Sequence, residues 1–156
     1  MSLRANLGGT GKRPGQLTLP ELQFLVRRAG EQAGFDVSTE VPVLSGRMDC
    51  AWLERTTFRW LVAWEFDGRD VRPNHIAGNA RRLGNAKKFA ASDAALKIQA
   101  LYSVRGGVLG SSGVATCRRC LAPEVRVIVD EELMAPAGIE AIMDAARALT
   151  CAPRSV

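Results

Sequence analysis

The chain has 156 residues, of which 47% are hydrophobic and 24% charged, a composition that indicates one globular domain with a substantial core and excludes wholesale disorder. No apolar run approaches the roughly 20 residues of a membrane span, and the N-terminus shows no secretory pattern, so we expect no membrane partner and a cytoplasmic location. The formal net charge of +5 is concentrated in residues 1–16 and 68–92, while the remainder is net acidic.

Residues 1–16 contain four glycines and one proline without hydrophobic periodicity, so we expect a flexible basic tail ahead of a single domain over 17–156. Residues 18–33 are predicted to form a helix, because Thr18 and Glu21 have the spacing of a capping box and apolar residues follow at helical spacing. Glu21 could also reach a metal site, although the capping box already gives it a role.

Three strands are predicted next, over 35–43, 46–53 and 58–67, joined as a meander. The third is the most strand-like run in the chain. Strict alternation would place five large apolar residues on one of its faces: Phe58, Trp60, Val62, Trp64 and Phe66. The opposite face becomes acidic at Glu65 and Asp67, which favours a central strand that opens at its C-terminal end onto a functional site.

The second half of the chain alternates between helical and strand patterns. A helix is predicted over 74–89, a strand over 95–104, another strand over 125–129 and a closing helix over 137–149. A helix between two strands indicates a crossover connection, so the predicted sheet is mixed, with four or five strands flanked by helices. The predicted fold class is α/β in the broad sense, of the α+β kind.

Asp49 lies on the second predicted strand, beside the strand that carries Glu65. Carboxylates on neighbouring strands commonly hold a hard divalent cation through oxygen ligands, and Asp67 could add a third carboxylate. The alternative is that Asp49 forms a surface ion pair with Arg47 or Arg59. The spacing is compatible with both interpretations.

The basic segment 68–92 directly follows the acidic positions. A basic surface beside an acidic site suits a polyanionic partner such as nucleic acid, contacted by the predicted helix. The candidate contact residues are His75, Arg81, Arg82, Lys87 and Lys88. A solvated helix face without such a partner has the same composition, and a lone histidine can equally be structural.

Four cysteines in a chain of this kind do not indicate a disulfide framework. Cys117 and Cys120 have the spacing of half a zinc site, and a complete site needs a second pair of ligands. Cys151 could supply a third ligand, whereas Cys50 lies on a strand that is predicted to be buried. Zinc binding and unremarkable thiols are both open interpretations.

The order of helix, three-strand meander, helix and strand resembles the PD-(D/E)XK phosphodiesterase superfamily, whose fold is restriction-endonuclease-like. The resemblance is carried by Gly46-Arg47-Met48-Asp49 and by Ala63-Trp64-Glu65-Phe66-Asp67. It covers about residues 18–104, with 105–156 as peripheral decoration. It implies an αβββαβ core and a nuclease that hydrolyses phosphodiester bonds, with DNA as the expected substrate. It also implies that Asp49 and Glu65 bind Mg²⁺ or Mn²⁺.

The chain departs from the family pattern at one position. The family's lysine stands two residues after the glutamate, where this chain has Asp67. Some members of the superfamily move the lysine to the following helix, which makes Lys87 and Lys88 the first candidates for its role. Arg82 and Lys97 are remoter candidates, and Asp67 would serve as a further metal ligand.

Two other functions are compatible with the same fold. One is a catalytically inactive nuclease-fold protein that binds nucleic acid through its basic helix. The other is a protein-binding module whose basic helix is merely solvated. Many enzymes that cut both strands of a duplex are dimers, so a homodimer is compatible with the nuclease interpretation.

Overall fold

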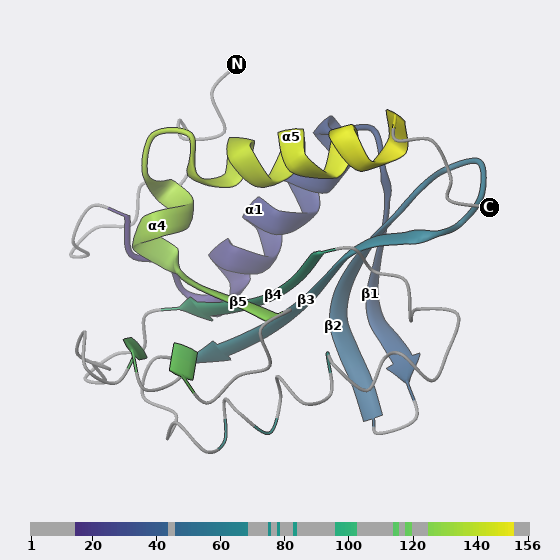
Figure 1. Ribbon diagram of the computed structural model, residues 1–156. Coiled ribbons are helices and arrows are strands. Elements are labelled where there is room, and N and C mark those ends of the chain that lie inside the picture. Colours follow the sequence, from purple (N-terminus) through teal and green to yellow (C-terminus); the bar gives the residue numbers. More distant parts are fainter. Residues whose placement is uncertain are drawn as a thin grey trace.

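Five strands form one mixed sheet in the computed structural model of the chain (Figure 1). They are β1 (Asp36–Val43), β2 (Gly46–Leu53), β3 (Trp60–Gly68), β4 (Leu96–Tyr102) and β5 (Val125–Val129). Their order across the sheet is their order in the chain. The structure describes residues 15–43, 46–68, 75, 78, 83, 96–102, 114–115, 118–119 and 125–151.

The sheet changes from antiparallel to parallel at β3. The first three strands pair antiparallel, whereas β4 runs parallel to β3 and β5 runs parallel to β4. A parallel pair needs a crossover connection, and between β3 and β4 the structure assigns His75, Gly78 and Leu83 to helix. The predicted α+β class with a mixed sheet of four or five strands is confirmed, and the described sheet has five.

Two long helices cover one face of the sheet. Figure 1 shows α1 (Leu19–Gln32) and α5 (Gly138–Cys151) together on that side. Thr18 precedes α1 and completes the predicted capping box with Glu21, whose Oε2 accepts the Thr18 N–H at 2.7 Å. In the described ranges, no helix is long and apolar enough to cross a membrane.

The larger core fills the space between these helices and the sheet, and Trp52 of β2 lies at its centre. The indole ring of Trp52 lies 6.0 Å from the Phe35 ring and 5.3 Å from the Trp64 ring, centroid to centroid. Its Nε1 donates a hydrogen bond to the Val26 carbonyl oxygen at 3.2 Å. A Cβ on Gly30 would lie 2.6 Å from that nitrogen, so the glycine lets α1 approach the ring.

A smaller core lies on the opposite face of the sheet, and it corrects the predicted faces of β3. This second core consists of Met48, Ala51, Trp60, Ala63, Leu83 and Val125. The register of β2 against β3 shifts by one residue between the Trp52–Val62 and Leu53–Trp60 pairs. Leu61 is the additional residue of this bulge and joins the larger core, so the prediction that Trp60 shares a face with Trp64 is wrong.

Helix α4 (Asp130–Met134) lies between β5 and α5, and the sequence patterns did not predict it. Asp130 is fully buried at its start. The Oδ2 atom accepts the Leu17 N–H at 2.9 Å and Oδ1 accepts the Glu131 N–H at 2.9 Å. The carboxylate therefore joins the segment before α1 to the end of β5.

Candidate functional site

The candidate site lies where β2 separates from β3. Backbone pairing of these strands extends only as far as Cys50 and Trp64, and Figure 1 shows the strands diverging beyond that end of the ladder. At the point of divergence, Oδ2 of Asp49 accepts the Phe66 N–H at 2.7 Å. The Asp49 side chain thus takes the place that a β2 carbonyl would occupy in a continuous ladder.

The backbone of β1 is irregular beside Asp49. Glu40 has a φ of 53°, a left-handed conformation that is uncommon for a residue other than glycine. The register passes from Thr39–Cys50 to Val41–Met48 without a pair between them. Residues two positions apart on a regular strand share a face, but here Met48 belongs to the smaller core and Cys50 to the larger one. Asp49 lies between them, where β2 changes which face its side chains take.

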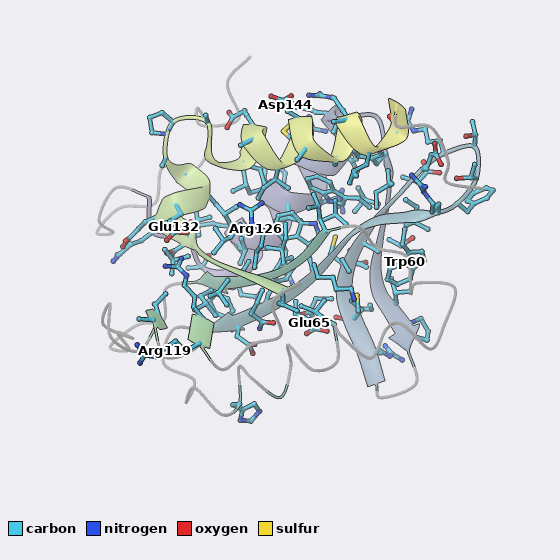
Figure 2. All side chains as sticks on the ribbon, in the orientation of Figure 1. Trp60, Glu65, Arg119, Arg126, Glu132 and Asp144 are labelled. Atoms are coloured by element: carbon cyan, nitrogen blue, oxygen red, sulfur yellow. The ribbon has the colours of Figure 1, made fainter. Side chains whose placement is uncertain are left out.

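Glu65 and Asp67 project from β3 on the side away from α1 and α5. Their neighbours Trp64 and Phe66 belong to the larger core, so alternation directs the two acids to the other face. Figure 2 shows Glu65 on the side of the sheet opposite Asp144 of α5. Glu65 is 3% exposed and Asp67 is 8% exposed. Carboxylates this deeply buried are rare in proteins unless they are paired or hold a metal.

Strand β4 adds two polar side chains to the same face, while its neighbours Ile98 and Ala100 belong to the larger core. In the parallel ladder Lys97 pairs with Ala63, and Gln99 pairs with Glu65. Lys97 is 4% exposed and Gln99 is fully buried. We call this group of four residues the acidic face: Glu65, Asp67, Lys97 and Gln99.

A side-chain hydrogen bond links the two strands across the acidic face. The Nε2 atom of Gln99 donates to Oδ2 of Asp67. The oxygen of that amide, Oε1 of Gln99, is buried and accepts no hydrogen bond from any described residue. Buried polar atoms nearly always have a partner, so this oxygen marks a place where a group beyond the described residues is expected to bind.

The carboxylates do not form a complete protein cage for a metal ion. Within the described residues, no three Asp, Glu, His or Cys side chains come together in an arrangement that could hold one. Mg²⁺ usually keeps several waters and is bound by one or two carboxylates together with substrate phosphate. Two carboxylates and the unpaired carbonyl oxygen of Gln99 fit that oxygen-based chemistry.

The other predicted site residues have different roles or fall outside the described residues. His75 is exposed in a helical position between β3 and β4. Glu21 serves the capping box of α1. The predicted nucleic-acid contacts Arg81, Arg82, Lys87 and Lys88 lie outside the described residues, as do the paired cysteines Cys117 and Cys120 and the side chain of Cys151.

Gln99 is the site residue that sequence reasoning missed, and Lys97 was placed last among the lysine candidates. The sequence pattern does indicate that these two residues share a face, because Lys97 and Gln99 alternate with apolar residues inside a predicted strand. A strand that pairs parallel on both edges is usually covered on both faces, as β4 is over residues 97–101, so polar residues within it require an explanation.

A separate hollow of about 350 Å³ lies among β5, α4 and α5. Its charged lining residues are Arg118, Arg126 and Glu132. Nη2 of Arg118 lies 2.7 Å from Oε1 of Glu132 and also donates to the Val127 carbonyl oxygen at 3.1 Å. The Arg118 guanidinium therefore already has protein partners, and none of the carboxylates of the acidic face lines this hollow.

The thiol of Cys50, next to Asp49, is buried and unreactive. Desolvation by burial, with the neighbouring Asp49 carboxylate as a smaller cause, raises its pKa from the ordinary 9.0 to about 12. At pH 8, iodoacetamide should label Cys50 about a thousandfold more slowly in the folded chain than in urea, because only the thiolate reacts. Mass spectrometry of the Cys50 peptide measures both rates, and equal rates would contradict this burial.

Comparisons of the chain with protein-family models, with curated proteins and with solved structures found no match. The support for a function therefore comes from the chemistry of the site and from the order of the elements around it.

Proposed function

We propose that this chain is a metal-dependent nuclease that hydrolyses phosphodiester bonds in nucleic acid, with DNA as the expected substrate. The observation that carries the proposal is the burial of Glu65, Asp67 and Lys97 on one face, at the place where β2 separates from β3. Burying ionisable groups costs free energy, and clusters of this kind occur preferentially at functional sites.

The order of the elements supports the same proposal. Helix α1, three antiparallel strands, helical residues and the parallel strand β4 follow one another as an αβββαβ core of the PD-(D/E)XK type would require. Asp49 lies on the second of these strands and Glu65 near the end of the third. These are the positions at which the resemblance expects the two metal ligands.

In this proposal Asp49 and Glu65 hold Mg²⁺ or Mn²⁺. When bound, such a cation lowers the pKa of a coordinated water and offsets negative charge on the phosphate. The chain orients the ligands: the Phe66 N–H fixes one oxygen of Asp49 at 2.7 Å, and the sheet backbone fixes Glu65. Hydrolysis would form a bond between a water oxygen and phosphorus and break the bond to the leaving oxygen, and the proton given up by the water would be balanced by the one that the leaving oxygen takes up.

Lys97 is our candidate for the role that the family assigns to the lysine after the glutamate. It lies on the strand next to Glu65, diagonally across the parallel ladder, a distance that a long side chain can span. The residue is buried at 4% exposure, and a positive charge held there would act strongly on a neighbouring phosphate. Lys87 and Lys88 are the competing candidates.

Replacing Lys97 with methionine should lower the single-turnover cleavage rate by about a hundredfold, because one electrostatic contact to the transition state is lost. Mn²⁺ binding in the absence of substrate should be unchanged or tighter, because a positive charge near the cation has been removed. Lys97→Arg keeps the charge and should retain more activity. A fully active Lys97→Met variant would return the role to Lys87 or Lys88.

The test of the function is a cleavage assay with single- and double-stranded DNA and RNA. The purified chain is incubated with each polymer in Mg²⁺, in Mn²⁺ and in EDTA. Cleavage that requires metal supports the proposal and identifies the polymer. A folded chain that cuts none of the four but binds DNA, with affinity that falls as salt rises, would instead be an inactive nucleic-acid-binding module.

If the chain binds DNA without cleaving it, the predicted basic contact residues are the next ones to test. Removing two phosphate contacts in Arg81→Ala/Arg82→Ala should then weaken binding for all sequences alike and reduce its salt dependence. A chain that neither cleaves nor binds any of the four polymers would favour a protein-binding module.

A further inference from the structure

Gln99 is the fully buried amide in the middle of the acidic face. One end of the amide is used, because Nε2 donates to Oδ2 of Asp67. The other end, Oε1, is enclosed and accepts no hydrogen bond from the described residues. Buried carbonyl oxygens in proteins nearly always have a hydrogen-bond partner or a bound ion or water.

The orientation of this amide is fixed by its partner. Rotating the amide by 180° would turn Oε1 toward the Asp67 carboxylate, where two acceptor oxygens would repel each other. The carbonyl oxygen must therefore face away from Asp67. In the parallel ladder Gln99 pairs with Glu65 of the neighbouring strand, so Gln99 lies beside the proposed metal ligand.

We infer that Oε1 of Gln99 is a ligand of the divalent cation held by Asp49 and Glu65, and that Asp67 is the positioning residue that orients it. This inference rests on the proposed function. Glutamine carbonyl oxygens are suitable ligands for hard divalent cations. A neutral oxygen adds a ligand without adding negative charge to a face that already carries Glu65 and Asp67.

The hydrogen bond between Gln99 and Asp67 gives a physical reason for an aspartate where the resembled family has its lysine. A lysine at position 67 could not accept the hydrogen bond from Gln99, whereas a carboxylate accepts it and fixes the direction of Oε1. Asp67 and Gln99 therefore act as one unit. In this chain Asp67 stands where the family has its lysine, and it orients the Gln99 oxygen. The positive charge of the site then comes from Lys97 on β4.

The experiment measures Mn²⁺ binding to the intact chain without nucleic acid, by calorimetric titration and by the electron paramagnetic resonance signal of free Mn²⁺. Gln99→Leu removes the oxygen and should raise the dissociation constant by about tenfold or more, the scale seen when a supporting group of a metal site is lost. Gln23→Leu, the same change at an exposed position of α1, is the matched control and should bind as the wild type does.

Gln99→Glu separates a ligand from a structural support. It keeps an oxygen at this place but cannot donate a hydrogen bond to Asp67 when ionised. If Oε1 is a ligand, Gln99→Glu should bind Mn²⁺ more tightly than Gln99→Leu does, and Mn²⁺ should raise the melting temperature of Gln99→Glu by more than that of Gln99→Leu. If Gln99 only supports Asp67, both variants should lose binding to the same degree, which would overturn the inference.

The proposed function and this inference can fail separately. Wild-type binding that disappears in Glu65→Ala but persists unchanged in Gln99→Leu would retain the metal site and remove Gln99 from it. A wild type that binds no Mn²⁺ and cleaves no polymer would remove both. Should Gln99→Leu fail to fold, the metal-dependent melting of Gln99→Glu still decides, because an unchanged melting temperature would contradict a ligand at this position.

Discussion

Cleavage should fall at least about a thousandfold when Glu65 is replaced with glutamine. The variant keeps the shape of the side chain but weakens its hold on a divalent cation, whose contribution to such reactions is several kcal/mol, or about three powers of ten. Glu65 is 3% exposed and its backbone is held in the ladder with β4, so no other described side chain can easily move into its place. The measurement is the single-turnover rate in Mg²⁺.

Two controls make this result specific to the site. Glu31→Gln makes the same change at an exposed position of α1 and should leave the rate unchanged. The melting temperature of Glu65→Gln, measured in EDTA, shows whether the variant is folded. Cleavage that survives undiminished in a folded Glu65→Gln protein would mean a different active site or a contaminating nuclease.

The largest expected loss of stability is at Gly138, the first residue of α5. A Cβ at this position would lie 2.2 Å from the Glu132 carbonyl oxygen and 2.5 Å from that of Leu133. Both atoms belong to the backbone of α4, so they cannot move aside as a side chain would. Gly138→Ala should therefore lower the free energy of unfolding by about 3 kcal/mol, measured as a shift in the urea midpoint.

The same substitution at Gly78 should have the opposite sign. Gly78 is also helical, and a Cβ there would meet no atom of the described residues within 4 Å. Alanine should stabilise that helix by up to about 1 kcal/mol, because it restricts the unfolded chain and favours helical geometry. If both variants shifted the urea midpoint equally, the contact between α4 and α5 would not be the cause.

The sequence contained most of the strand and helix order, because that order follows from local patterns. The run of aromatic and branched residues predicted β3, and Thr18 with Glu21 predicted the start of α1. Asp49 and Glu65 could be named as candidates because they fall on consecutive strands, whose pairing in a meander is local. Short connections and strong periodicity carry this information.

The remaining features depend on contacts that no local pattern encodes. The bulge at Leu61 reverses the face of Trp60, and nothing in the run of aromatic residues indicates where a register shift falls. The parallel pairing of β3 with β4 decides that Gln99 lies beside Glu65. A slip of one residue would have turned Gln99 toward the opposite core, so the site could be predicted only in part.

The hydrogen bond between Leu17 and Asp130 has a consequence for folding during protein synthesis. Its partners are 113 positions apart in the chain, and the contact of Arg147 with the Gln32 carbonyl oxygen spans 115. While the ribosome is still adding the segment that becomes α5, the apolar stripe of α1 has no complete partner. Such nascent chains are prone to associate, so we expect these elements to complete their packing only once α5 has been synthesised, and to benefit until then from chaperones that shield the stripe.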